Sequence, residues 1–401
     1  MIYTEKQKEL LRAFKEKKLK RINILHGSVR SGKTWISLVL WAFWVMTSPK
    51  DKNYLMVAKT LTSLKRNCLD LLESLVGKNN FSYSIGQKEG VLFGRKVYLE
   101  GVNDARAESK IRGMTLQGAY CDELTLFTED FFSMLLSRLS EPKAKLFGTT
   151  NPDSPNHWIK TNYIDRQDEL DLFIMQFLIE DNTTLDSSYV ESLKKEYVGV
   201  FYNRFILGLW VIAEGLVYPM FDLERHVVTE CSEPKDEYFE YYISIDYGTV
   251  NPCSMGLWRL ERDRAIKVKE LYFDSKKQKR QATDEEYYTM LEELAGDKLI
   301  SCVIVDPSAA SFIETIRRHG KFSVRKANND VLDGIRVTGT LIQNNKVFIH
   351  KSCENTIREF GVYRWDDKAN EDRVIKEFDH AMDETRYVCY TILKKRLIRD
   401  V

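Results

Sequence analysis

Eight consecutive residues near the start of the chain have the types and spacing that hold a polyphosphate. They match the Walker A pattern GxxxxGK[ST] in full and are Gly27, Ser28, Val29, Arg30, Ser31, Gly32, Lys33 and Thr34. A short apolar segment precedes them and a helix-forming segment follows, so backbone N–H groups and the helix start can face phosphate oxygens. We expect Lys33 to reach the β- and γ-phosphates and Thr34 to ligate Mg²⁺. The loop therefore predicts a site for ATP with Mg²⁺.

Two adjacent acids supply the expected partner of this loop. Gly118–Cys121 is a short apolar strand candidate, and Asp122 and Glu123 follow it directly. Acidic pairs after strands are common on surfaces, but downstream of a Walker A loop this pattern predicts a Walker B motif. In that motif Asp122 holds Mg²⁺, directly or through water, and Glu123 polarises the attacking water. A Glu placed directly after the Asp favours an ATPase over a GTPase-type switch.

A third segment and two arginines complete the candidate ATPase site. Lys145–Pro152 (KLFGTTNP) predicts a strand that ends in Thr150 and Asn151, whose hydroxyl and amide groups can sense the γ-phosphate by changing partners. The alternative is an ordinary Thr/Asn-Pro turn. Arg112 and Arg30 are candidates to supply positive charge to the transition state, and a solvated surface arginine is the alternative for Arg112.

Three aspartates in the second half form a different pattern. Asp246 and Asp306 each end an apolar strand candidate, and Asp383 lies on a helix candidate with His380 three residues and Asp379 four residues before it. These helical spacings place the side chains on one face. Carboxylates placed in this way can converge on two divalent ions, which activate water and stabilise the leaving oxygen in phosphodiester cleavage. Carboxylate oxygens favour Mg²⁺ or Mn²⁺ over zinc. The alternatives are turn-capping aspartates and a structural histidine.

The elements that must position these residues follow two patterns. In the first half, strand candidates alternate with helices and indicate an α/β domain with a mainly parallel sheet. The expected elements are helices at 6–17 and 35–46 and strands at 22–26, 54–58, 96–100, 118–121 and 145–149. From Tyr241 onward, consecutive strands joined by short turns come before the helices. This order predicts an α+β core that differs from the first.

Composition excludes several classes of protein. The chain has 401 residues, of which 43% are hydrophobic and 30% charged, and only 8 prolines, so it can form sizeable cores and is unlike a disordered chain. We find no membrane-spanning apolar run and no signal-peptide pattern, and the 7 scattered cysteines form no CxxC motif, which suits a reducing cytoplasm. A net charge of +1 excludes a globally basic nucleic-acid binder.

Basic residues are instead gathered in short runs. These runs are 15–21, 394–399 and Lys276–Arg280 (KKQKR). The run Lys276–Arg280 is the best candidate for binding the phosphates of a DNA backbone. The alternative for each run is a solvated surface.

Taken in order, the motifs resemble those of bacteriophage terminase large subunits, and most nearly the PBSX-type family. The segments that carry the resemblance are GSVRSGKT, YCDEL, GTTNP, GLWVIAEGLVYPMF, SIDYG, VIVDPSA and DHAMDETRY, and together they cover about Thr4 to Tyr387. The resemblance implies a DNA-translocating P-loop ATPase at 1–180, a linker subdomain at 181–235 and an RNase H-like nuclease at 236–401. It also implies that Gln7 reads adenine, that 149–151 couple hydrolysis to motion, and that Asp246, Asp306 and Asp383 bind the nuclease metals beside His380.

The same resemblance implies particular partners and a place of action. The expected partners are double-stranded DNA, the portal protein of the procapsid, a small terminase subunit and, on the portal, a ring of identical copies that associate only weakly without it. We expect action in the host cytoplasm and transiently at the portal vertex, not in the mature virion, with docking through a surface other than a long C-terminal tail. Two alternatives remain open. One is a repair or recombination ATPase-nuclease, and the other is a nucleotide-switched scaffold that binds DNA.

Overall fold

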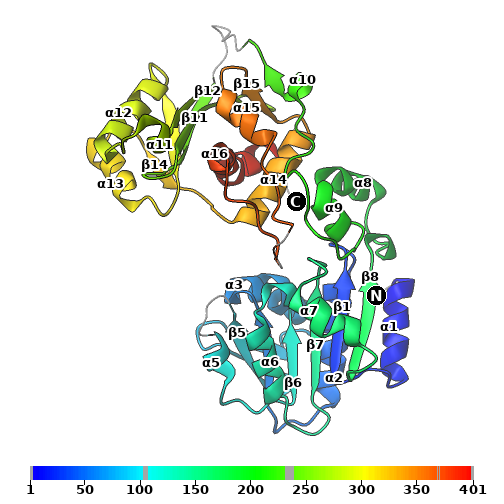
Figure 1. Ribbon diagram of the computed structural model, residues 1–401. Helices are drawn as coiled ribbons and strands as arrows, with labels where there is room; N and C mark the ends of the chain where they lie inside the picture. The colour runs from blue at the N-terminus through cyan, green and yellow to red at the C-terminus, as the bar shows by residue number, and fades with distance from the viewer. Residues whose placement is uncertain (1–2, 103–106, 231–238, 368, 370, 399–401) are drawn as a thin grey trace. The chain divides into compact units, whose positions relative to one another are not determined.

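The computed structural model describes residues 3–102, 107–230, 239–367, 369 and 371–398 (Figure 1). The chain divides into two compact units. The first unit is Met1–Lys194 with Val200–Ile212, and the second unit is Lys195–Gly199 with Ala213–Val401. Residues 181–235, which the sequence analysis set apart as a linker, are thus divided between the two units.

The first unit is built on one sheet with eight strands in its described residues, in the order β3-β4-β5-β2-β6-β7-β1-β8. The strands are β1 (Ile22–Gly27), β2 (Tyr54–Ala58), β3 (Phe81–Ser84), β4 (Glu89–Leu92), β5 (Arg95–Gly101), β6 (Gly118–Cys121), β7 (Lys145–Thr150) and β8 (Leu172–Phe177). All neighbours from β5 to β8 in this order are parallel, which confirms the mainly parallel sheet. The antiparallel β3–β4 hairpin was not predicted, because its strands are short and interrupted by polar residues.

Strand β7 lies between β6 and β1 and pairs in parallel with both. The carboxyl ends of these three strands therefore meet at one edge of the sheet, where parallel α/β sheets hold their ligands. The Walker A loop follows β1, the Asp122–Glu123 pair follows β6, and Asn151 follows β7. The topology thus brings together three motifs that are far apart in the chain.

Helix α2 anchors the phosphate loop to the core of the first unit. Its segment is almost wholly apolar and buried, and Trp41 packs on Trp44 and Phe147 with ring centroids 5.6 and 5.7 Å apart. At Gly118 of β6 a side chain would collide with Trp44, so the helix lies directly on the sheet. The helices of this unit are α1 (Glu5–Lys15), α2 (Lys33–Thr47), α3 (Leu61–Leu64), α4 (Asp70–Val76), α5 (Ala107–Ile111), α6 (Glu129–Arg138) and α7 (Trp158–Asn162), while α8 (Ser187–Glu196) and α9 (Gly199–Phe205) each cross a boundary between the residue ranges of the two units.

The sheet of the second unit has seven strands in the described residues, in the order β14-β13-β10-β11-β12-β15-β9. They are β9 (Val227–Val228), β10 (Glu240–Asp246), β11 (Cys253–Leu260), β12 (Ala265–Phe273), β13 (Ile300–Val305), β14 (Val324–Lys326) and β15 (Val347–His350). The first three long strands, β10 to β12, are antiparallel neighbours, and β13 and β14 extend the sheet in parallel from the other side of β10. This is the expected RNase H-like arrangement, and it confirms the second half of the fold prediction.

Helices cover both faces of this sheet (Figure 1). The helices are α10 (Leu223–His226), α11 (Ser275–Gln278), α12 (Asp284–Ala295), α13 (Ala310–His319), α14 (Val331–Gln343), α15 (Glu354–Phe360), α16 (His380–Val388) and α17 (Lys394–Leu397). Because side chains alternate along a strand, Ile243 and Ile245 of β10 pack into the core with α12 and α13. Ser244 and Asp246, on the opposite face, contact α16. One strand thus serves the apolar core and the polar site.

A fully buried ion pair joins α16 to the sheet. Lys267 of β12 pairs with Glu384 of α16, and both side chains are 0% exposed. The Glu384 carboxylate also accepts a hydrogen bond from the Trp258 indole at 2.7 Å, and the Lys267 ammonium donates to the Thr356 hydroxyl at 2.7 Å. A side chain at Gly256 would collide with both Glu384 and Lys267, so this strand position requires glycine. Both charged groups of the pair thus have further partners, which buried charges require.

No helix among the described residues is long and apolar enough to cross a membrane. Six cysteines in the described ranges are free thiols, and Cys231 lies outside those ranges.

We predict that Lys267→Met lowers the free energy of unfolding of the second unit by about 3–5 kcal/mol, because it leaves Glu384 buried without its cation. Adding Glu384→Gln, which keeps an acceptor for Trp258, should restore more than half of that loss. Urea unfolding followed by tryptophan fluorescence measures both. The control is Lys321→Met, which breaks an exposed pair with Glu292 and should cost less than about 1 kcal/mol. A loss in Lys267→Met no larger than in the control would contradict the prediction.

Candidate active sites

The phosphate loop joins β1 to α2 and has the backbone that its glycines permit. Gly27 has φ +136° and Gly32 has φ +83°, and both values lie in the region that favours glycine. At Gly27 a side chain would also collide with the Phe177 carbonyl of β8. Gly32 is the N-cap of α2, so the helix begins directly at Lys33. The loop thus presents a helix N-terminus to the carboxyl edge of the sheet, as the sequence predicted.

Lys33 is linked to the candidate base Glu123 through Asn151. The buried Lys33 ammonium donates to the Asn151 amide oxygen at 2.6 Å and to the Ser28 carbonyl at 3.1 Å. The Asn151 amide nitrogen in turn donates to both oxygens of Glu123, at 3.1 and 3.0 Å. Burial lowers the pKa of Lys33, and the charges of Glu123 and Asp122 oppose this shift. Burial also raises the pKa of the Glu123 carboxyl, which Lys33 opposes.

Two side chains hold the Walker B aspartate through its two oxygens. The Thr149 hydroxyl donates to one oxygen of Asp122 at 2.9 Å, and the Asn67 amide donates to the other at 3.2 Å. Asn67 lies in a π-helical turn, Lys65–Leu69, between α3 and α4. Such turns occur frequently at functional sites. Asn67 was not predicted from the sequence, because no spacing rule links it to Asp122.

The loop residues fit a nucleoside triphosphate with Mg²⁺. The Ser28 and Ser31 hydroxyls are buried and have no hydrogen-bond partner among the described residues, as expected of groups that face a ligand. Thr34 is the second residue of α2 and is partly exposed, in the position of the Mg²⁺-binding hydroxyl.

The remaining candidates of this site lie in different places. Gln7 forms a capping box with Thr4 at the start of α1, and its amide nitrogen lies 3.1 Å from where a Gly32 side chain would be, so it is next to the loop. The Thr150 hydroxyl donates to the Thr125 hydroxyl at 3.0 Å and accepts from the Thr125 N–H at 3.2 Å. Arg112 is exposed on the protein surface, where it pairs with Glu108 at 2.9 Å.

The backbone of the loop has further partners that the sequence analysis did not identify. The Arg30 carbonyl accepts from the Asn182 amide at 2.7 Å, and the Val29 N–H donates to the Phe205 carbonyl at 2.8 Å. These contacts come from segments far along the chain and leave no local sequence signal.

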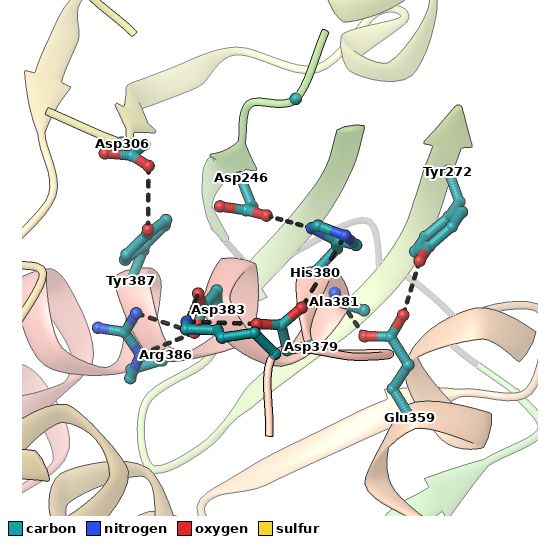
Figure 2. Close-up of polar contacts among 12 residues, drawn as sticks. Asp246, Tyr272, Asp306, Glu359, Asp379, His380, Ala381, Asp383, Arg386 and Tyr387 are labelled. Atoms are coloured by element: carbon teal, nitrogen blue, oxygen red, sulfur yellow. Dashed lines mark hydrogen bonds and ion pairs between the residues drawn. The ribbon is translucent and has the colours of Figure 1, made fainter. Parts of the chain in front are cut away.

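The second unit has a pocket of about 730 Å³ with an acidic floor. Asp246, Asp379, His380 and Asp383 line it, so the structure brings together residues of β10 and α16 that the sequence predicted to meet. Figure 2 shows these side chains facing one another, with Asp306 beside them. Asp306 does not line the pocket, and its carboxylate accepts a hydrogen bond from Tyr387 of α16 at 3.3 Å.

The Asp246 carboxyl has a raised pKa. Burial raises its pKa to about 6, the charges of Asp383 and Asp306 contribute to the shift, and the hydrogen bond to His380 opposes it. His380 Nδ1 lies 2.9 Å from the Asp246 carboxylate. Burial lowers the pKa of His380, but Asp246 and Asp379 outweigh this effect and the net shift is upward.

Two cations balance the charge of Asp383. The Arg386 guanidinium lies 2.9 Å from one carboxylate oxygen, and the Lys376 ammonium lies 3.3 Å from the other. Lys376 also pairs with Asp379 at 3.2 Å. Figure 2 shows Asp383 and Asp379 on the same side of Arg386.

The donor set of this pocket fits hard divalent cations. Its side chains offer carboxylate oxygens, which hard cations prefer. Repulsion between the neighbouring carboxylates contributes to the raised pKa of Asp246, and a bound cation would lower that pKa again. Within the described ranges, no three His, Cys, Asp or Glu side chains form one close metal-binding group. The residues that would hold the ions are Asp246 and Asp383. Asp306 is near enough for its charge to contribute to the raised pKa of Asp246, and its role as a third ligand stays a prediction.

A buried glutamate positions the helix that carries His380 and Asp383. Glu359 of α15 is 0% exposed and accepts from the Ala381 N–H at 2.6 Å and from the Tyr272 hydroxyl at 2.8 Å (Figure 2). A carboxylate at a helix N-terminus satisfies a free N–H group and interacts favourably with the helix dipole. Glu359 was not predicted from the sequence, because its partners come from other segments of the chain.

These two sites define the class of protein. One chain carries a P-loop NTPase unit and an RNase H-like unit with a carboxylate pocket. The family model described as "Terminase large subunit, T4likevirus-type, N-terminal" matches residues 24–225. The chain belongs to the terminase large subunit family. The narrower PBSX-type resemblance stays a prediction.

Solved structures of the family cover nearly the whole chain. The large terminase of a thermophilic bacteriophage is 38% identical, with a TM-score of 0.91 over 98% of this chain and 100% of that one. Structures of the same phage protein with ADP and with ATP-γ-S are each 37% identical with TM-scores of 0.89. A curated relative, the terminase large subunit of Escherichia phage T5, is 22% identical over 274 residues. That match spans 65% of this chain and 61% of the T5 protein.

We predict a pH-dependent loss of stability that arises from His26, at the end of β1. Burial, with the charges of Lys33 and Lys160, lowers its pKa to about 4, and its Nδ1 is buried without a partner among the described residues. The unfolded state therefore binds more protons between about pH 4 and 6.5, so stability is lost as pH falls through this window. From about pH 7.5 to about pH 5 the loss from this group is about 2 kcal/mol.

His26→Gln should remove this part of the pH dependence. The measurement is urea unfolding at both pH values, followed by tryptophan fluorescence. An equal pH dependence in the wild type and the variant would show that His26 does not contribute.

Proposed function

We propose that this chain is both the motor and the nuclease of DNA packaging in a tailed phage. The first unit hydrolyses ATP to move double-stranded DNA into the procapsid, and the second unit cuts concatemeric DNA with Mg²⁺ or Mn²⁺. The observation that carries the proposal is the presence in one chain of two separate candidate sites. One is built on Lys33, Asn151 and Glu123, and the other on Asp246 and Asp383.

In the first unit, Lys33 and Thr34 are placed to hold the phosphates and Mg²⁺, and Glu123 to orient the attacking water. Burial raises the pKa of Glu123, which makes its carboxylate a stronger base. To bind phosphate, Lys33 must exchange the oxygens of Asn151 and Ser28 for those of the nucleotide. Because Asn151 also holds Glu123, this exchange transmits nucleotide binding to the base. The same contacts give the segment 149–151 its coupling role.

In the second unit, bound divalent ions would activate water and stabilise the leaving oxygen of a phosphodiester. The residues of the chain prepare the site for this chemistry. His380 orients the Asp246 carboxylate, and Arg386 with Lys376 positions the Asp383 carboxylate through ion pairs. Glu359 fixes the start of the helix that carries His380 and Asp383.

The partners follow from membership of the terminase family and from the packaging role. They are the portal protein of the procapsid, a small terminase subunit that selects the DNA, and further copies of the chain in a ring on the portal. The place of action is the host cytoplasm and, transiently, the portal vertex.

Two variants separate the activities. Lys33→Ala should lower ATP hydrolysis by about 100-fold or more, because it removes the buried cation that holds the phosphates, and should leave Mn²⁺-dependent nicking of plasmid DNA unchanged. Asp246→Ala should do the reverse. The readouts are phosphate release and conversion of supercoiled to nicked and linear plasmid.

Exposed residues of the same types serve as controls. Lys18→Ala and Asp297→Ala, whose side chains are 66% and 91% exposed, should retain both activities. Loss of both activities in one folded variant would disprove the two-site proposal. Absence of cutting by the wild type in Mn²⁺ would remove the nuclease from the proposal and leave the ATPase.

A further inference from the structure

Two large apolar side chains are exposed on the rim of the carboxylate pocket. Phe378 is 55% exposed and Val250 is 57% exposed, and both line the pocket. Phe378 directly precedes Asp379 and His380 in the chain, and all three residues line the pocket. Exposed apolar side chains that gather at a pocket mark a surface that meets a ligand.

The backbone at Phe378 is held in an unfavourable conformation. Its φ is 54°, in the left-handed region that bulky residues rarely adopt. Burial does not compensate for this strain, since more than half of the side chain is exposed. The flanking residues hold it instead, because Lys376 pairs with Asp379 and Asp383, and α16 begins at His380. Strain held at a pocket rim indicates a functional position.

An arginine lies between Phe378 and a second aromatic ring. The guanidinium carbon of Arg358 is 5.9 Å from the ring centroid of Phe378 and 5.9 Å from that of Tyr272. All three residues line the pocket, and the Arg358 side chain is 43% exposed. Aromatic rings and guanidinium planes are the groups on which proteins stack nucleobases.

The rest of the rim carries charges of both signs, since Glu377 and Asp274 line it and Lys277 lies 3.8 Å from Asp274. Lys276 and Lys277 of α11 line the same pocket and are exposed. A pocket with an acidic floor, exposed lysines on its rim and an exposed aromatic ring matches a ligand that carries phosphates and flat apolar faces. In a fully stacked duplex those faces are covered by neighbouring bases, so the exposed ring has no surface to stack on.

We propose that Phe378 and Arg358 form a stacking platform for a nucleobase that is unstacked next to the phosphodiester at the carboxylates. The ligand is a DNA strand in a locally melted duplex, and Lys276 and Lys277 hold its backbone phosphates. The platform deepens the proposed nuclease function and rests on it. Nuclease cutting should therefore prefer DNA that opens readily.

The test is DNA binding by the full chain, without nucleotide and with Ca²⁺ in place of Mn²⁺. Fluorescence anisotropy compares a labelled duplex with a central run of mismatches against a fully paired duplex of the same length. The wild type should bind the mismatched duplex about tenfold or more tightly, which is the scale of one base–aromatic stack. Phe378→Ala should lose this preference with little change for the paired duplex, and Phe378→Trp should retain it.

Further variants separate stacking from charge. Arg358→Lys, which keeps the charge but loses the planar group, should lose part of the preference. Lys277→Ala should weaken binding to both duplexes equally and reduce the salt dependence. Phe43→Ala, which removes a phenylalanine that is 42% exposed in α2, is the matched control and should behave as wild type.

An unchanged preference in Phe378→Ala, or no preference in the wild type, would overturn the platform. Plasmid cutting by the wild type with Mn²⁺ is scored independently. If cutting is present and the preference does not depend on Phe378, the nuclease stands and the platform is wrong. If cutting is absent and the preference depends on Phe378, the platform stands as a DNA-binding site and the nuclease is wrong.

Discussion

The buried pair between Lys267 and Glu384 is the constraint on which the second site depends. Two charges removed from water stabilise a fold only when each has a full set of partners, and here Trp258 and Thr356 complete them. The pair ties α16 to the sheet one residue away from Asp383. Any shift of this helix would break the buried contacts and move Asp383 relative to Asp246, which lies on β10. A costly interaction in the interior thus gives the exposed pocket its geometry.

Both candidate sites hold groups of like charge close together, and each offsets their repulsion with different residues. Groups of like charge must lie close together to bind phosphate or metal, and burial strengthens their repulsion. In the first unit, Lys33 faces Asp122 and Glu123, and Asn151 keeps cation and base linked. In the second unit, Lys376 and Arg386 balance Asp383. Each site is therefore a balanced set of charges that a ligand must rearrange in order to bind.

Local patterns predicted the α/β sheet of the first unit, an α+β core in the second and most of the residues that carry chemistry, while the RNase H-like class came from the resemblance to terminases. The Walker A loop, the acids that follow β6 and end β10 and the helix of Asp383 depend on short spacings, and the structure places them as expected. Asn67, Glu359 and Lys267 were not predicted, because each acts on a residue far along the chain. Asp306 was predicted as a metal ligand from its place at a strand end together with Asp246 and Asp383, and this role stays a prediction. Its bond to Tyr387 depends on packing that no spacing describes.

The division of the chain between the two units has a consequence for inheritance. Residues 195–199 belong to the second unit, where the Glu196 carbonyl accepts from Thr340 and Tyr197 lies against Arg336. Residues 200–212 return to the first unit, where the Phe205 carbonyl holds the phosphate loop. No single break in the gene therefore separates two whole units. After a single crossover between related phages, residues 195–199 or 200–212 would come from a different parent than the rest of the unit to which they belong. The two units are therefore expected to be inherited together.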